Sequence, residues 1–194
     1  MREPPRETPP AAGRCDEDTA VLIEALASAD GLRRKQARRC LVRAGERVVG
    51  PLIGALNEED PVIRTEAAEA LLYIASPSAA AALVESLGDR EFGVRWLAAE
   101  ALIALKCDGI HALLEGVIQH SGSLWFRQAA HHVLHDHYCE RLRSELRPVL
   151  DALSGRDAED TAPVAAGEVL HRIAATGAMG HAGLEQGPME GGRE

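Results

Sequence analysis

The sequence predicts an all-α fold, an α-solenoid of about five helix pairs. Three observations predict it. One segment pattern returns along the chain at intervals of 30 to 32 residues. Apolar doublets spaced for one helical stripe alternate with these segments, and no stretch shows the strict apolar alternation of a strand. Aromatic residues make up only 3% of the chain, so the core must be built from Ala, Leu, Val and Ile.

The repeated segment is clearest at residues 60–71, Asp-Pro-Val-Ile-Arg-Thr-Glu-Ala-Ala-Glu-Ala-Leu. At residues 91–102 the run Ala-Ala-Glu-Ala-Leu follows an Arg at the same offset. Two further copies keep the Arg, an Ala and a Leu; they are Arg34, Ala37 and Leu41, and Arg127, Ala130 and Leu134. A fifth, weaker copy ends in Ala166, Val169 and Leu170, and Pro163 stands where the Arg is expected. This recurrence predicts the second helix of each pair.

A first helix is expected before each copy, from an apolar doublet with a third apolar residue three or four positions later. These triplets are Leu22, Ile23 and Leu26; Leu52, Ile53 and Leu56; Leu83, Val84 and Leu87; Leu113, Leu114 and Val117; and Val149, Leu150 and Leu153. The spacing places each triplet on one stripe of a helix. Such a stripe is too narrow for a stable isolated helix, so successive pairs must stack to bury a continuous core.

The helix pairs are expected at roughly 18–45, 46–75, 77–106, 108–138 and 141–175, which gives a repeat domain over 18–175. Asp60 before Pro61 and Ser76 before Pro77 each combine an N-cap with a proline at the first helical position. The Pro-rich segment 1–17 and the Gly-rich segment 176–194 are predicted to be a disordered N-terminal segment and a disordered C-terminal tail.

Composition restricts the class of partner. No apolar run is long enough to cross a bilayer, and the net charge of −9 disfavours nucleic acid, which selects a basic footprint. Residues 31–47 are the exception, with seven positive side chains against one negative, and this basic patch could contact an acidic partner. The four cysteines are far apart with no C-x-x-C pair, so we expect reduced thiols in a cytoplasmic protein.

Residues about 46–106 resemble the HEAT-like repeat first described in phycobilisome lyases, Asp-x-x-[Val/Ile]-Arg-x-x-Ala-Ala-x-Ala-Leu. The resemblance implies a right-handed superhelix of HEAT-like helix pairs. It also implies that the repeated Arg pairs with an acidic residue of a neighbouring repeat. We therefore expect a structural ladder from Arg64, Arg95 and Arg127 together with Asp60 and Glu91.

Some enzymes share this scaffold, and their functional residues can be sought in this chain. Deoxyhypusine hydroxylase holds two irons with His-Glu dipeptides, where this chain has Thr65-Glu66, Trp96-Leu97 and Gln128-Ala129, so that activity is excluded. HEAT-like DNA glycosylases use a strongly basic groove, which an acidic chain does not match. A subunit of a phycobilin-lyase-type or metal-dependent enzyme remains the alternative. No nucleophile motif or nucleotide-binding glycine loop occurs, so neither a catalytic residue nor a cofactor is expected.

His131 and His135 are weak candidates for a metal site, because their i, i+4 spacing places both rings on one helical face. Aligning the repeats places His171 at the position equivalent to His135, one repeat later. Hydrogen-bonded packing of buried imidazoles is the commoner use of such residues, and a pH-sensitive or partner-binding surface is a third interpretation. We expect no tight metal site.

The second helices carry side chains that should point away from the core. Trp96, Leu97 and Tyr73 are apolar or aromatic at such positions, which is typical of interfaces. The charged and polar residues expected around them are Glu66, Glu69, Glu100 and His132. The sequence therefore indicates a non-catalytic scaffold or adaptor, which binds another protein through the surface of its second helices.

Overall fold

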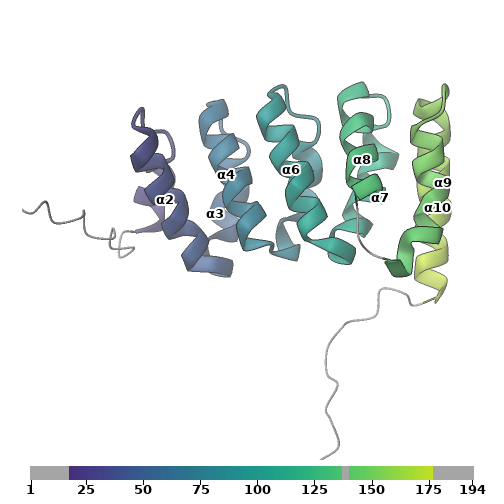
Figure 1. Ribbon diagram of the computed structural model, residues 1–194, viewed down its shortest axis with the longest axis horizontal. Helices are drawn as coiled ribbons and strands as arrows, with labels where there is room; N and C mark the ends of the chain where they lie inside the picture. Colours follow the sequence, from purple (N-terminus) through teal and green to yellow (C-terminus); the bar gives the residue numbers. More distant parts are fainter. Residues whose placement is uncertain (1–17, 137–139, 177–194) are drawn as a thin grey trace, which may run out of the picture.

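The computed structural model describes residues 18–136 and 140–176, which are α-helical and contain no strand. Ten helices stack side by side into an elongated α-solenoid (Figure 1), so the predicted fold class is confirmed. They are α1 (Thr19–Ala25), α2 (Gly31–Ala44), α3 (Val49–Ala55), α4 (Pro61–Ile74), α5 (Ala80–Ser86), α6 (Phe92–Ala104), α7 (Ile110–His120), α8 (Leu124–Asp136), α9 (Glu140–Leu153) and α10 (Ala158–Thr176). The 3₁₀ turns η1 (Gly45–Val48), η2 (Pro77–Ala79) and η3 (Lys106–Gly109) join the first four pairs.

The segments predicted to be disordered fall almost entirely outside this range. Residues 1–17 are not described, and of the predicted C-terminal tail only residue 176, the last of α10, is described. Both predictions of disorder stay predictions.

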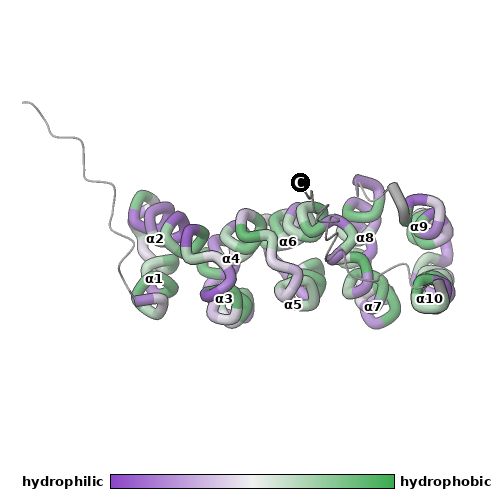
Figure 2. The backbone as a smooth tube through the Cα atoms, turned by 90° about the horizontal axis from the view of Figure 1, so that it is seen from below, coloured by the Kyte–Doolittle hydropathy of each residue, from purple (hydrophilic) through white to green (hydrophobic). Residues whose placement is uncertain are grey.

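The helices form two layers (Figure 2). In the first four pairs the first helix lies in one layer, which contains α1, α3, α5 and α7. The second helix lies in the other layer, with α2, α4, α6 and α8 in contact in that order. We call these the first layer and the second layer. Each helix therefore packs against the partner of its own pair, and the second-layer helices also pack on one another in sequence, as stacked repeats require.

The last pair is placed the other way round. α9 packs beside α8 and continues the second layer, whereas α10 packs on α7 and continues the first layer (Figure 2). The prediction that Ala166, Val169 and Leu170 belong to a second-layer helix is therefore wrong. The predicted equivalence of His171 with His135 fails for the same reason, because α10 and α8 lie in different layers.

Side-chain caps begin several helices where the sequence places an acid before an apolar stripe. The carboxylate of Asp30 accepts a bond from the Leu32 amide at 2.9 Å, and that of Asp60 accepts from the Val62 amide at 2.8 Å. Asp18 caps α1 in the same way. Each cap satisfies an amide that has no partner within the helix. α2 ends at Gly45, whose φ of 63° lies in the region that glycine adopts most easily.

Small side chains let the second-layer helices approach closely. Ala67, Ala68 and Ala70 on α4 are fully buried, and the matching alanines of α6 are equally buried. α4 and α6 pack directly on each other along these faces. Leucines from the first-layer helices fill the space between the layers, and each fully buried one contributes about 1.5–3 kcal/mol of transfer free energy. Helices that approach this closely leave little room for large rings between them, which agrees with the low aromatic content of the chain.

Two observations concern the predicted compartment. Cys40 and Cys107 each take part in a disulfide bond. The interpretation of these two cysteines as reduced thiols is therefore wrong. The argument for a reducing compartment therefore fails for them. Among the described helices, none combines the length and apolar content needed to cross a membrane.

Candidate partner-binding site

The repeated Arg closes the turn between the two helices of its own repeat. Arg64 Nη1 donates to the carbonyl oxygens of Glu58 and Glu59, both at 2.8 Å. Arg95 Nη1 donates to the Asp89 and Arg90 carbonyls in the same way, at 2.7 and 3.1 Å. The residues accepting these bonds lie six and five positions before the Arg. Arg34 repeats the arrangement with Ser28 and Ala29, and Arg127 donates to Ser121. The shared role of this Arg is thus to satisfy backbone carbonyls of the turn that follows the first helix.

Arg64 also pairs with an acid of the following repeat, but with a different one from those predicted. Its Nε and Nη2 atoms donate to the two carboxylate oxygens of Asp89 at 2.7 and 3.0 Å, and Arg64 is only 5% exposed. Asp60 instead caps α4, and Glu91 stands at the N-cap position of α6 without a side-chain capping bond. The expectation that Asp60 and Glu91 supply the acids of the ladder is therefore wrong.

Glu66 and Glu69 face the basic patch of the same chain. Glu66 pairs with Arg34 at 3.2 Å and with Arg38, and Glu69 pairs with Arg38 at 2.8 Å. Both carboxylates are half-buried in these contacts. These two carboxylates join α4 to α2. The sequence predicts them as open charges at the border of a partner-binding surface, and the structure instead pairs them with arginines of the same chain.

Three large aromatic side chains are exposed together where α6 meets α8. Phe92 is 68% exposed, Trp96 46% and Trp125 56%. Phe92 and Trp96 are one helical turn apart on α6, with ring centroids 6.3 Å from each other. The guanidinium carbon of Arg95 lies 4.5 Å from the Trp125 ring centroid and 5.7 Å from that of Phe92. One arginine therefore bridges the aromatic rings of two adjacent repeats by cation–π contact.

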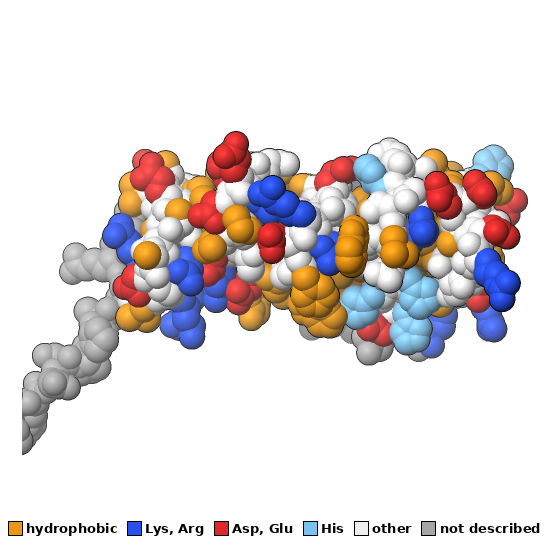
Figure 3. All heavy atoms as spheres, turned by 90° about the horizontal axis from the view of Figure 1, so that it is seen from above, with side chains coloured by type: hydrophobic (Ala, Val, Ile, Leu, Met, Phe, Trp, Pro, Cys, Tyr) orange, Lys and Arg blue, Asp and Glu red, His pale blue; other side chains and the backbone are white. Residues whose placement is uncertain are grey.

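His132 completes this group from α8. Its ring stacks on Trp96 with centroids 5.1 Å apart and 17° between the planes. Its two nitrogens lie 3.2 Å from Glu100 Oε1 and 3.1 Å from Asp136 Oδ2, so carboxylates on both sides hold the imidazole in place. Phe92, Arg95, Trp96, Trp125 and His132, here called the aromatic site, surround an open depression of about 230 Å³. Figure 3 shows hydrophobic side chains beside histidines at this part of the molecule.

The predicted partner-binding residues divide between this site and other places. Trp96, Glu100 and His132 meet at the aromatic site. Tyr73 is 64% exposed but lies on α4, where it borders a groove toward α2. Leu97 is half-buried and packs on the core, so its prediction as an exposed contact is wrong. Sequence reasoning missed Phe92 and Trp125, which stand in the first turn of their helices, before the repeated Arg.

His131 and His135 stack on each other with ring centroids 6.1 Å apart. Partial burial lowers the pKa of His131, and the neighbouring His135 and His132 lower it further, whereas Asp136 opposes them. A hydrogen bond with His135 at 2.7 Å lowers the pKa of the Asp136 carboxyl. Within the described residues, no three His, Cys, Asp or Glu side chains are grouped so that they could hold a metal ion.

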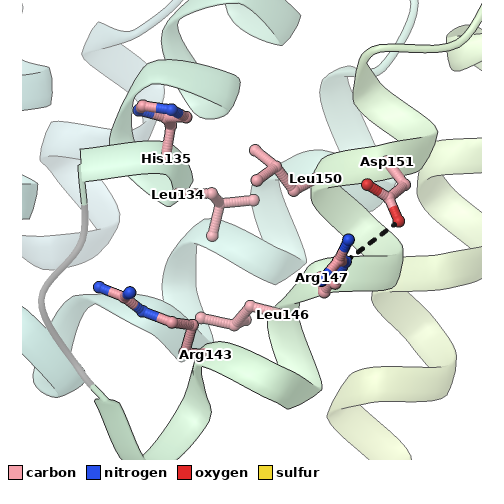
Figure 4. A pocket seen from close by; sticks show the side chains of 7 residues that line it. All are labelled: Leu134, His135, Arg143, Leu146, Arg147, Leu150 and Asp151. Carbon is pink, nitrogen blue, oxygen red and sulfur yellow. Dashed lines mark ion pairs between the residues drawn. The ribbon is translucent and has the colours of Figure 1, made fainter.

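A larger pocket of about 450 Å³ opens between α8 and α9 (Figure 4). Leu134, Leu146 and Leu150 point toward one another at its floor, and His135 and Arg143 lie at its edge. Arg147 and Asp151, one turn apart on α9, form an exposed ion pair at the rim with 3.9 Å between Nε and Oδ2. The pocket shares no residue with the aromatic site, so the two are separate features of the second layer.

Comparison with known families identifies the repeat in the first half of the molecule. A family model described as HEAT repeats matches residues 19–103, from the first residue of α1 almost to the end of α6. The match covers less than half of the 194 residues and supports a HEAT-like repeat over the first three helix pairs. The description names a repeat and no activity. No curated protein matches the chain.

Proposed function

We propose that this chain, whose first three helix pairs are HEAT-like repeats, is a non-catalytic scaffold that binds a partner protein at the aromatic site. One observation carries the proposal: three large aromatic side chains, each about half exposed or more, converge from α6 and α8 around Arg95. Aromatic residues and arginine are the residue types that dominate binding energy at protein interfaces.

The stacked geometry favours binding because the site is already ordered. Trp96 rests on His132, and Arg95 rests on Trp125, so these side chains lose little freedom when a partner covers them. Ordering a mobile side chain at an interface costs about 0.5–1.5 kcal/mol. A preorganised set avoids most of that cost and keeps the gain from desolvating the rings.

The size and surroundings of the site indicate the kind of contact. Its depression of about 230 Å³ is smaller than the roughly 300–1,000 Å³ usual for small-molecule sites, and it is open to solvent. An aromatic or aliphatic side chain of a partner fits a depression of this kind. Glu100 and Asp136 lie beside His132 and supply a charged border. An apolar centre with a charged border is the usual anatomy of a protein–protein interface.

Capture of partners from the native host by immobilised protein tests the proposal. Trp96→Ala should weaken capture of the specific partner by about 30- to 1,000-fold, the equivalent of 2–4 kcal/mol. The variant loses the stacking contacts of an exposed ring, about 0.5–1.5 kcal/mol, so its Tm should fall by only about 1–6 °C.

Val164→Ala is the matched control, because Val164 is also well exposed but lies on α10 in the first layer. It should leave capture unchanged. Equal loss of capture in the control, or a much larger fall in Tm for Trp96→Ala, would contradict the proposal. A chromophore that copurifies with the protein from the host would favour the lyase-subunit alternative instead.

A further inference from the structure

A second open groove, of about 400 Å³, runs between α2 and α4 in the second layer. Its lining combines cationic and apolar side chains with one carboxylate; these residues are Lys35, Arg38, Arg39, Val42, Arg43, Glu69 and Tyr73. It shares no residue with the aromatic site, so the two surfaces can be tested separately.

The cations of this groove are not equivalent. Arg38 is only 15% exposed at its side chain and is neutralised by Glu66 and Glu69. Lys35 and Arg39 are exposed on the same helix, and neither forms an ion pair with any described residue. The folded chain therefore uses part of its basic patch internally and leaves two positive charges at the groove that no described acid neutralises.

An apolar surface lies beside these charges. Tyr73 is 64% exposed, and Val42 is half-buried at the groove wall. An exposed aromatic ring next to such cations is complementary to a ligand that carries both carboxylates and an apolar side chain.

We propose that the groove between α2 and α4 binds an acidic peptide segment of a partner protein that also carries an aromatic or aliphatic residue. Carboxylates of the segment pair with Lys35 and Arg39, and its apolar side chain covers Tyr73. This surface is additional to the aromatic site and does not depend on it.

The charge distribution favours a short acidic peptide over a nucleic acid. A nucleic acid presents one phosphate per nucleotide and needs a cationic track along its length. Here the exposed cations of the groove come from α2, while Glu100 follows on α6 and Asp136 on α8. A polyanion that continued along the second layer would meet these carboxylates, on a chain of net charge −9.

Fluorescence anisotropy with two labelled peptides, Glu-Glu-Glu-Phe-Glu-Glu and hexalysine, tests the proposal on the full chain. The acidic peptide should bind, and its affinity should fall as ionic strength rises from about 0.05 to 0.5 M, where the Debye length becomes short. The double variant Lys35→Glu/Arg39→Glu should weaken binding about tenfold or more, since two exposed pairs contribute roughly 0.5–1 kcal/mol each. Tyr73→Ala should weaken it as well.

Arg33→Glu is the matched control, because Arg33 is exposed on α2 but does not line the groove. It should leave the affinity within about twofold, and Trp96→Ala should do the same. Circular dichroism checks that each variant is folded, and Lys35→Gln/Arg39→Gln repeats the test without charge reversal. The proposal is overturned if the acidic peptide does not bind, if Arg33→Glu weakens it as much as the double variant, or if a labelled oligo-dT binds the groove more tightly than the peptide.

Discussion

Replacing Gly116 with alanine tests how closely α5, α7 and α8 approach one another. A Cβ atom at Gly116 would lie 2.3 Å from Val84 Cγ1 on α5 and 2.9 Å from Phe126 Cζ on α8. Carbon atoms in optimal contact are about 3.5–4.0 Å apart. Val84 and Phe126 are both fully buried, so neither side chain has open space into which it could move.

Two effects of opposite sign decide the size of the change. Alanine is favoured over glycine within a helix by about 1 kcal/mol. Forcing an extra methyl group into a packed core costs about 1–3 kcal/mol, and a shortfall of more than 1 Å against one neighbour indicates the upper end. The net loss of unfolding free energy should therefore be about 2 kcal/mol, or about 4–8 °C in Tm for a domain of this size.

Urea unfolding and thermal melts followed by circular dichroism measure this change, with Gly167→Ala as the matched control. Gly167 lies within α10, and a Cβ atom there meets nothing within 4 Å. The control should gain about 0.5–1 kcal/mol, because only the helix preference acts. If Gly116→Ala lowers the unfolding free energy and Gly167→Ala raises it, the effect of packing is separated from that of helix propensity.

A second variant examines the cause of the loss. Val84→Ala removes the atom that the new methyl group would meet first, so it should cost less in the Gly116→Ala background than in the wild type. If Gly116→Ala stabilises the protein as much as Gly167→Ala does, the close approach of α5 and α7 is refuted. Simple additivity of the two substitutions would refute Val84 as the source of the clash.

Two further predictions concern charged groups. Arg64→Ala should lower the unfolding free energy by about 3–5 kcal/mol in urea titrations, because it leaves Asp89 and two carbonyls without their buried partner; a loss below about 1 kcal/mol would contradict this role. His131 has a lowered pKa in the folded state, so the unfolded chain binds more protons, and stability should fall as pH drops below about 6.5, the ordinary value for histidine. His131→Gln should make the decline between pH 7 and 5 shallower, and an unchanged decline would contradict this role of His131.

The helices and their pairing could be predicted because repeated local patterns encode them. Apolar triplets at helical spacing, capping acids and prolines at first turns each act over a few residues. The placement of α9 and α10 could not be predicted in this way. An apolar stripe shows that a helix is buried on one side, and nothing in the stripes of α9 and α10 specifies which layer each joins.

The site was only partly predictable for a related reason. Positions counted forward from the repeated Arg lead to Trp96 and His132, whereas Phe92 and Trp125 precede it by three and two positions. Their exposure depends on how each helix is rotated against its neighbours, which the spacing from the Arg does not specify. The acid that pairs with Arg64 was also misjudged, because Asp60 satisfies its own helix while Asp89 approaches from the next repeat.

Each repeated Arg donates to a carbonyl six positions earlier, and Arg34, Arg64 and Arg95 also donate to the one five positions earlier; these bonds have a consequence for how such a chain can change over generations. Because the acceptors are backbone atoms, the motif places no demand on which side chains occupy the turn. The donor and its acceptors also travel together in one short stretch of chain. A gene duplication that copies this stretch yields a complete new turn at once, and residues gained elsewhere in a repeat leave it intact. The intervals between Arg34, Arg64, Arg95 and Arg127 are 30, 31 and 32 residues. These differences fit repeats that gained or lost residues outside the short stretch between each Arg and its acceptors.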